Sequence, residues 1–383
     1  MIAVRVGELG DSVKAQEAMH FAIGQLRSAV AEEAYLSTGL DYSRPTSIMA
    51  NINEVCNYRC PMCMHWRPEF ARHSELSVDQ WKNTLASLRE FLGSYLIAFL
   101  GGEPFIKPGF LDILEYCHES GISFTTTTNG SLLLRGDTIR RLVNAAPVHL
   151  NISVDGPTAD IHDRSRGVAG AFEKIERAIH AIRAEQQRTG QHFPIRIKPT
   201  VHLWNFRSMP SMVEWVQRIG ADTVDFEPMR EWTTESIRDM WMGPDQIDDL
   251  DHVIQELIAQ KRAGAPIETS ERRLTGMPNH FGGGNVEPEV TPCRVGLRRF
   301  AIAPNGDVTT CWFYDPIGNM VQQSARDIWT GAVGRRRRQE TVACKKACAY
   351  SCMAQKPLKN LFERGQLLLA AERKRTALIT IAS

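Results

Sequence analysis

Short apolar runs and longer amphipathic segments alternate along most of the chain. From Ser47 to about Lys261, each apolar or β-branched run is followed by a loop and then by a segment with helical spacing. Strands joined through helices lie parallel, with right-handed crossovers, so this repeat predicts an α/β fold curled into an open barrel or a wound sheet. The predicted strands are Ile48–Val55, Tyr95–Leu100, Ser123–Thr128, Val148–Val154, Arg196–Leu203 and Thr223–Phe226.

The segments between these strands predict the crossover helices. Ser77 and Gln80 form the pattern of a capping box, which marks the start of a helix. Folds of this type bind ligands at the carboxyl ends of their strands, so we expect the functional site there. Helical spacing covers Val78–Leu88, Leu111–Glu119, Ala171–Ile182, Met212–Ile219 and Ile247–Ile258.

The regions on either side of the repeat differ from it in composition. Residues 1–46 predict a helical N-terminal extension, and 47–262 form the barrel. Residues 263–292 are rich in Gly and Pro, which predicts a linker or lid. Residues 293–356 are too few and too rich in cysteine for another barrel unit, so we expect a second, metal-stapled domain, followed by a C-terminal helix over 357–383.

Composition and charge point to a soluble protein without a nucleic-acid or membrane partner. Apolar residues make up 43% and charged residues 23% of the chain, and the net charge is +1. The basic run Arg335–Arg338 is interpreted as solvated surface, with nucleic-acid binding as the alternative. The first residues lack a signal-peptide pattern, and no apolar run approaches the roughly 20 residues that span a bilayer. We therefore expect a cytoplasmic protein.

Nine cysteines change this picture, because eight of them fall into two tight groups. An odd count without a secretion signal argues against a disulfide framework and favours metal binding. Cys117 stands alone on a predicted helix and is interpreted as a core residue. The first group, Cys56, Cys60 and Cys63, follows the first predicted strand. Three thiolates leave one iron of a four-iron cluster open to a ligand.

The alternative for the first group is a structural zinc ion with His65 as its fourth ligand. The spacing Cys-x3-Cys-x2-Cys, however, resembles the signature of the radical S-adenosylmethionine (SAM) superfamily. This resemblance covers roughly residues 47–230 and implies a partial (β/α)6 TIM-like barrel. It also implies a [4Fe–4S] cluster whose free iron binds S-adenosylmethionine and whose electron cleaves it to a 5′-deoxyadenosyl radical. One departure is Met62, where the family usually has an aromatic residue near the adenine.

The same resemblance assigns a cosubstrate pocket to residues at the strand ends. Gly101-Gly102-Glu103-Pro104 matches the motif that grips the methionine amino group, although a plain turn is its alternative. Asn129 and Ser153 end the third and fourth predicted strands, and Arg166 is similar to the arginine that pairs with the cosubstrate carboxylate. The implied cofactor-binding residues are Met62, Gly101, Gly102, Glu103, Pro104, Asn129, Ser153, Asp155 and Arg166.

The second cysteine group begins at a predicted hairpin. Arg299–Ile302 and Val308–Thr310 flank a turn, which brings Cys293 and Cys311 together. The spacing Cys-x12-Gly-x4-Cys resembles the SPASM/twitch branch of the superfamily and implies one auxiliary [4Fe–4S] cluster, with structural zinc as the alternative. Two residues complete the ligand set from Cys344, Cys348 and Cys352, with the latter two favoured. The spare thiol is either a hydrogen-atom donor or merely buried.

The substrate is the least determined feature. The short N-terminal extension favours a small polar metabolite, such as a sugar or aminoglycoside-like precursor of a secondary metabolite, that is dehydrogenated or epimerised. Peptide modification is the alternative activity, and a non-catalytic metal protein is the alternative class. A reductant such as flavodoxin or ferredoxin is the expected partner. Candidate substrate contacts are Asp225, Glu227, Arg230 and Glu231.

Overall fold

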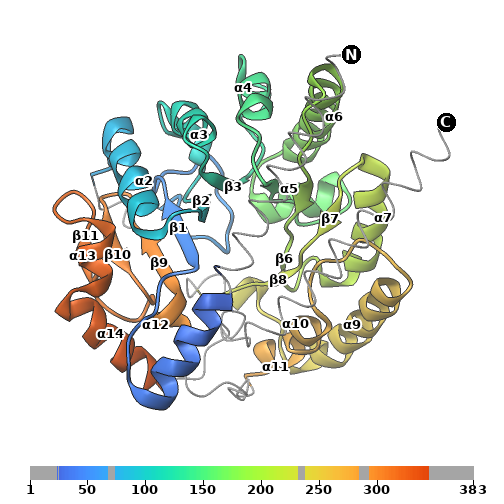
Figure 1. The fold of residues 1–383 in the computed structure, drawn as a ribbon. Coiled ribbons are helices and arrows are strands. Elements are labelled where there is room, and N and C mark those ends of the chain that lie inside the picture. Colours follow the sequence, from blue (N-terminus) through green and yellow to red (C-terminus); the bar gives the residue numbers. More distant parts are fainter. Residues whose placement is uncertain (1–23, 25, 68–73, 232–237, 284–292, 345–383) are drawn as a thin grey trace, which may run out of the picture.

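A curved, mostly parallel sheet forms the centre of the molecule and helices cover its outer face (Figure 1). The computed structural model describes residues 24, 26–67, 74–231, 238–283 and 293–344. The strand order is β11-β10-β9-β1-β2-β3-β4-β5-β7, with β6 and β8 paired separately. The strands are β1 (Ser47–Asn51), β2 (Leu96–Leu100), β3 (Ser123–Thr128), β4 (His149–Ile152), β5 (Ile195–Ile197), β6 (Thr200–Val201), β7 (Thr223–Val224), β8 (Glu227–Pro228), β9 (Arg299–Ile302), β10 (Asp307–Thr309) and β11 (Gly318–Asn319).

The α/β prediction is confirmed, because β1, β2, β3, β4, β5 and β7 pair in parallel in this order. The capping box is present: Ser77 Oγ accepts from Gln80 N–H at 3.2 Å, and Ser77 N–H donates to Gln80 Oε1 at 2.8 Å. The helices are α2 (Val78–Leu92), α3 (Phe110–Glu119), α4 (Thr138–Ala145), α5 (Ala159–Arg166), α6 (Ala171–Thr189), α7 (Met209–Ile219), α9 (Ile247–Arg262), α10 (Glu271–Thr275), α11 (Met277–Phe281), α12 (Val295–Arg298), α13 (Ala325–Thr330) and α14 (Ala332–Val342).

The apolar faces of these helices pack on the sheet to form one continuous core. Trp81 and Leu85 of α2 are fully buried, as is Ile175 of α6. Cys117 of α3 is also fully buried, which confirms its assignment to the core. Among the described residues, no helix combines the length and apolar character that crossing a membrane requires.

The last two predicted barrel strands are shorter than expected. Arg196–Leu203 becomes β5 and β6, whereas Thr223–Phe226 contains only β7, and β8 follows it as a separate strand. Pro199 lies at the first break and has no N–H to donate to a neighbouring strand. Its carbonyl oxygen accepts a hydrogen bond from Glu227 N–H at 3.1 Å. The breaks move Thr200 and Glu227 out of the main sheet, onto the small β6–β8 pair.

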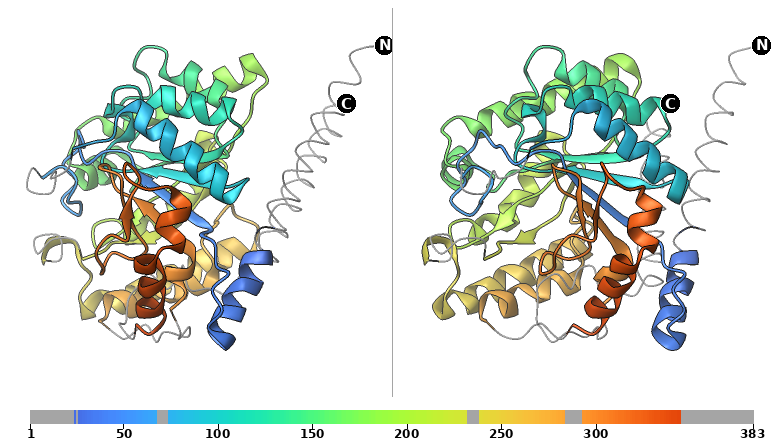
Figure 2. Two further views of the ribbon diagram at one scale, coloured as in Figure 1. Left: turned by 60° about the vertical axis from the view of Figure 1, so that its left-hand side comes forward. Right: turned by 90° about the vertical axis from the view of Figure 1, so that its left-hand side faces the viewer.

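The cysteine-rich segment extends the barrel sheet. β9 pairs with β1 in parallel, and β10 returns antiparallel to β9, which confirms the predicted hairpin. Figure 2 shows this segment beside the helix of residues 26–38. The predicted cysteine-rich domain therefore shares one continuous sheet with the barrel.

Two further expectations differ from the structure. Residues 263–283 are more structured than the predicted linker or lid: they include α10 and α11, which lie against α9, with Leu274, Met277 and Phe281 buried. Within the basic run, Arg338 is not solvated surface, because its guanidinium is buried and pairs with Asp41 at 2.6 Å. Residues 345–383, including the predicted C-terminal helix, lie outside the described residues.

Candidate active site

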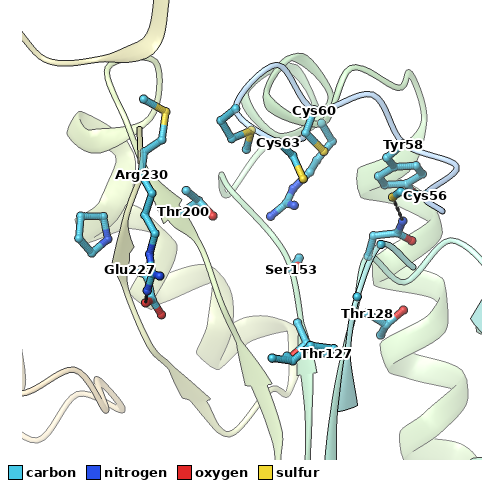
Figure 3. Close-up of a pocket in the computed structure, with 18 residues that line it drawn as sticks. Cys56, Tyr58, Cys60, Cys63, Thr127, Thr128, Ser153, Thr200, Glu227 and Arg230 are labelled. Carbon is cyan, nitrogen blue, oxygen red and sulfur yellow. Dashed lines mark hydrogen bonds and ion pairs between the residues drawn. The ribbon is translucent and has the colours of Figure 1, made fainter. Parts of the chain in front are cut away.

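The carboxyl ends of the barrel strands open into a cavity of about 250 Å³. Figure 3 shows the three thiols of the first cysteine group on one side of this cavity and Glu227 with Arg230 on the facing side. The cavity is lined by Cys56, Tyr58, Cys60, Met62, Cys63, Leu100, Gly101, Gly102, Thr127, Thr128, Asn129, Ser153, Arg166, Thr200, Glu227, Pro228, Met229 and Arg230.

The cysteine loop is held by hydrogen bonds to its own backbone. Cys63 N–H donates to the Cys60 carbonyl at 3.0 Å, and Trp66 Nε1 donates to the same carbonyl at 2.9 Å. Burial raises the pKa of Cys60 to about 11, because an apolar surrounding disfavours the thiolate. Metal binding deprotonates such thiols. Three thiols lining one cavity therefore fit an iron–sulfur cluster as their cationic partner.

The Gly101-Gly102 turn lies directly against the cysteine loop. A Cβ on Gly102 would lie 2.1 Å from the Val55 carbonyl oxygen, and one on Gly101 would lie 2.6 Å from that of Asn53. Gly101 also has a φ of +144°, which side chains rarely adopt. Only glycines allow the end of β2 to approach this closely, so the two motifs form one wall of the cavity.

Glu103 and Pro104 belong to this motif but lie behind the wall. Glu103 is fully buried, and its carboxylate accepts hydrogen bonds from Thr128 Oγ1 at 2.8 Å, Asn129 N–H at 2.7 Å and Phe105 N–H at 3.1 Å. Burial raises the pKa of Glu103 to about 7. Its carboxylate thus fastens β2 to β3, and the cavity lining does not include it.

Asp155 and Arg166 form a buried ion pair beside the cavity. Arg166 Nε lies 2.7 Å from Asp155 Oδ2, and an Arg166 terminal nitrogen lies 2.8 Å from Oδ1, so the pair is bidentate. Arg166 lines the cavity and also hydrogen-bonds the Cys60 thiol, whereas Asp155 is enclosed behind it. Asn129, Ser153 and Met62 line the cavity as well.

The facing side carries charged groups from the β6–β8 pair. Glu227 lies 3.1 Å from Lys198 and 2.9 Å from Arg230. Although burial raises the pKa of Glu227, Lys198, Arg273 and Arg230 lower it to about 2. Of the candidate substrate contacts, Glu227 and Arg230 reach the cavity; the lining does not include Asp225, which pairs with Lys198 and Arg273, or Glu231.

Some lining residues have no sequence motif that would have identified them. Tyr58 lies between two cysteines, and its buried hydroxyl has no hydrogen-bond partner among the residues that the structure describes. Thr200 and Met229 reach the cavity because the strands break before them. Pro199 is the sequence feature that could have indicated the strand break before Thr200.

The second cysteine group is partly described. Cys311 follows β10, and Cys344 lies just beyond α14. Tyr314 lies near both: desolvation and then the Cys344 and Cys311 thiols raise its pKa, and its hydroxyl donates to the Glu340 carbonyl at 3.3 Å. Cys293 is half-buried just before α12, while Cys348 and Cys352 lie outside the described residues.

Comparison with known families identifies both cysteine segments. Residues 50–196 match the radical SAM superfamily, and 293–353 match SPASM, an iron–sulfur cluster-binding domain. The chain belongs to the SPASM branch of the radical SAM superfamily. As a radical SAM enzyme it uses a [4Fe–4S] cluster, an auxiliary iron–sulfur cluster and S-adenosylmethionine.

Relatives of this radical SAM enzyme match most of its length. It is 24% identical over 325 residues to a PqqA peptide cyclase of Rhodopseudomonas palustris, covering 80% of this chain and 79% of the relative. It is 25% identical over 316 residues to an AdoMet-dependent heme synthase of Methanosarcina barkeri, covering 79% and 87%. SuiB of Streptococcus suis, solved with its precursor peptide SuiA, shares the fold with a TM-score of 0.62, 16% identity and coverage of 83% and 71%.

Proposed function

We propose that this enzyme cleaves S-adenosylmethionine in the described cavity and abstracts a hydrogen atom from a peptide. The observation that carries the proposal is that the three thiols of the first cysteine group line one cavity together with the glycine turn, Asn129, Ser153 and Arg166. In this assignment Cys56, Cys60 and Cys63 hold the cluster. A bound [4Fe–4S] cluster with one open iron supplies the electron for reductive cleavage.

The remaining lining residues bind and orient the reactants. The Gly101-Gly102 backbone lies close enough to the cysteine loop to contact a ligand bound there. Arg166 presents a guanidinium fixed by Asp155, which suits a carboxylate. The buried Met62 and Tyr58 keep water from the cysteine side of the cavity.

Glu227 and Arg230 are the proposed substrate contacts. Both lie across the cavity from the cysteines, and Lys198 holds the Glu227 carboxylate in place. A fixed carboxylate beside a guanidinium offers an acceptor and donors at one place, which suits an amide group with its N–H and C=O. Substrate groups held here face the thiols.

A peptide is favoured over a small sugar-like metabolite by the relatives. A PqqA peptide cyclase is among the similar proteins, and SuiB binds a precursor peptide. We further propose that Cys293, Cys311 and Cys344 contribute ligands to the auxiliary cluster.

Replacing Cys56, Cys60 and Cys63 together by Ala tests the radical chemistry. We expect the iron-reconstituted, dithionite-reduced variant to form no 5′-deoxyadenosine from S-adenosylmethionine, while retaining the iron of the auxiliary cluster. Cys117→Ala is the matched control, because this buried thiol lies in the core and should leave cleavage intact. Cleavage by the triple variant, measured by mass spectrometry under anaerobic conditions, would contradict the assignment.

The substrate class needs a separate measurement. Peptides encoded by short reading frames beside the gene are compared with sugars and aminoglycosides as stimulants of 5′-deoxyadenosine formation. We expect a peptide to increase the rate and to show a mass change. Stimulation and product formation by a sugar alone would return the assignment to a small metabolite.

A further inference from the structure

The Cys56 thiol receives a hydrogen bond from a side chain outside its own loop. Asn129 Nδ2 lies 3.7 Å from Cys56 Sγ, a distance within the range of hydrogen bonds to sulfur. Asn129 follows directly after β3, so the contact joins the end of a barrel strand to the cysteine loop.

The orientation of the Asn129 amide is set by its other partners. Its Oδ1 accepts from Ser131 N–H at 2.9 Å, and its Nδ2 donates to Asn57 Oδ1 at 3.0 Å. The reverse orientation would place two acceptor oxygens against each other and two donors against each other. The second N–H of the amide is therefore directed at the sulfur of Cys56.

Glu103 holds Asn129 at this distance. Its Oε2 accepts from the Asn129 N–H at 2.7 Å, and its backbone carbonyl accepts from Asn53 Nδ2 at 2.8 Å. Because Glu103 is fully buried, these bonds are protected from competition by water. The donor Asn129 and its support Glu103 thus both lie in the segments that follow β3 and β2.

We propose that Asn129 raises the reduction potential of the cluster by donating a hydrogen bond to the Cys56 sulfur, with Glu103 as the residue that positions it. Reduction adds negative charge to the cluster and its thiolates, and a donor to sulfur stabilises the reduced form more than the oxidised form. This inference rests on the proposed function, in which Cys56 is a cluster ligand. It gives Asn129 a role beyond lining the cavity, and it gives the enclosed Glu103 the role of positioning Asn129.

Asn129→Leu tests the proposal, because leucine has a similar volume but no donor. The measurement is a redox titration of the iron-reconstituted protein without S-adenosylmethionine, followed by electron paramagnetic resonance. We expect the first cluster to keep its iron and to be reduced only at lower potential. Ser131→Ala is the control: it removes a hydroxyl bonded to Asn57 but keeps the backbone N–H that holds Asn129, so the potential should not change. An unchanged potential in Asn129→Leu would overturn the proposal.

A second variant and a measurement on the unmodified protein guard against failed cluster assembly. Asn129→Ala removes the donor without placing a new side chain against Cys56, and the same lowering of the potential is expected. In the reduced wild-type protein labelled with 15N-asparagine, a nitrogen hyperfine coupling to the cluster is expected. Absence of this coupling would overturn the proposal even if neither variant assembles a cluster.

A Cys56→Ala variant separates the role of Asn129 from the assignment of Cys56 as a cluster ligand. Cys56→Ala should lose the first cluster if the ligand assignment holds. A fully retained first cluster in Cys56→Ala would refute the ligand assignment itself. Loss of the cluster in Cys56→Ala, combined with an unchanged potential in both Asn129 variants, would refute only the role of Asn129.

Discussion

The Glu103 carboxylate accepts three hydrogen bonds inside a fully enclosed site, from two segments that meet only in the folded protein. These donors favour the ionised form, but the loss of hydration outweighs them and raises the pKa to about 7. In the unfolded chain the ordinary value of 4.5 applies. Between these two values the folded protein binds a proton that the unfolded chain releases, so Glu103 links stability to pH.

Glu103→Gln removes this linkage. As the pH rises from about 5 to 7, the wild-type protein should lose stability relative to the variant, by at most about 3 kcal/mol, and the difference should level off above pH 7. Stability falls as the pH rises because folded Glu103 must release a proton that the unfolded chain has already released. Unfolding temperatures of the two anaerobic, iron-loaded proteins at several pH values check this, and a difference that does not vary with pH would contradict it.

At the scale of elements, the contact between the end of β2 and the cysteine loop determines the shape of the site. Gly102 N–H donates to Asn53 O at 3.2 Å and Glu103 N–H donates to Val55 O at 2.8 Å, so the two loops run side by side through backbone bonds. The absence of a Cβ at Gly102 permits this spacing. A larger residue must separate the loops and break these bonds.

Gly102→Ala should therefore prevent assembly of the first cluster. The Cβ would lie 2.1 Å from a backbone oxygen that no side-chain rotation can move. Gly190→Ala is the matched control: Gly190 ends α6 with a φ of +72° and has open space around it, so we expect only about 1–2 kcal/mol of lost stability. Iron content distinguishes them, and normal iron in Gly102→Ala would show that the loops can yield.

At the scale of the whole molecule, a buried ion pair ties the N-terminal helix to the auxiliary-cluster segment. Glu32, on the helix of residues 26–38, accepts from Arg298 Nε at 2.7 Å and from a terminal Arg298 nitrogen at 2.6 Å. Arg294, next to Cys293, lies 3.4 Å from the same carboxylate. The helix thus supports the region that leads into the hairpin of β9 and β10.

Glu32→Ala should lower the free energy of unfolding by about 3–5 kcal/mol, because it leaves buried guanidinium charge without its buried carboxylate. Glu33→Ala is the matched control. Its side chain is 62% exposed and pairs with Arg294 at 2.9 Å, so about 1 kcal/mol or less is expected. Denaturant unfolding compares them, and equal losses in the two variants would rule out a special role for Glu32.

The sequence alone determined the features that depend on local spacing. The alternation of apolar runs and helical segments predicted the parallel strands and their crossover helices, because side-chain periodicity reports local structure directly. The spacing of Cys56, Cys60 and Cys63 predicted a cluster-binding loop through its resemblance to a family signature, with three thiols close together in the sequence. The hairpin before Cys311 followed from its alternating strands and turn.

Only the tertiary structure decided which polar residues face the cavity. Glu103 and Asn129 are both strand-end residues, yet one is enclosed and the other lines the site, because contacts between β2, β3 and the cysteine loop direct their side chains. The pairing of β9 with β1 also depends on residues far apart in the chain. Such long-range packing leaves no local pattern from which it could be read.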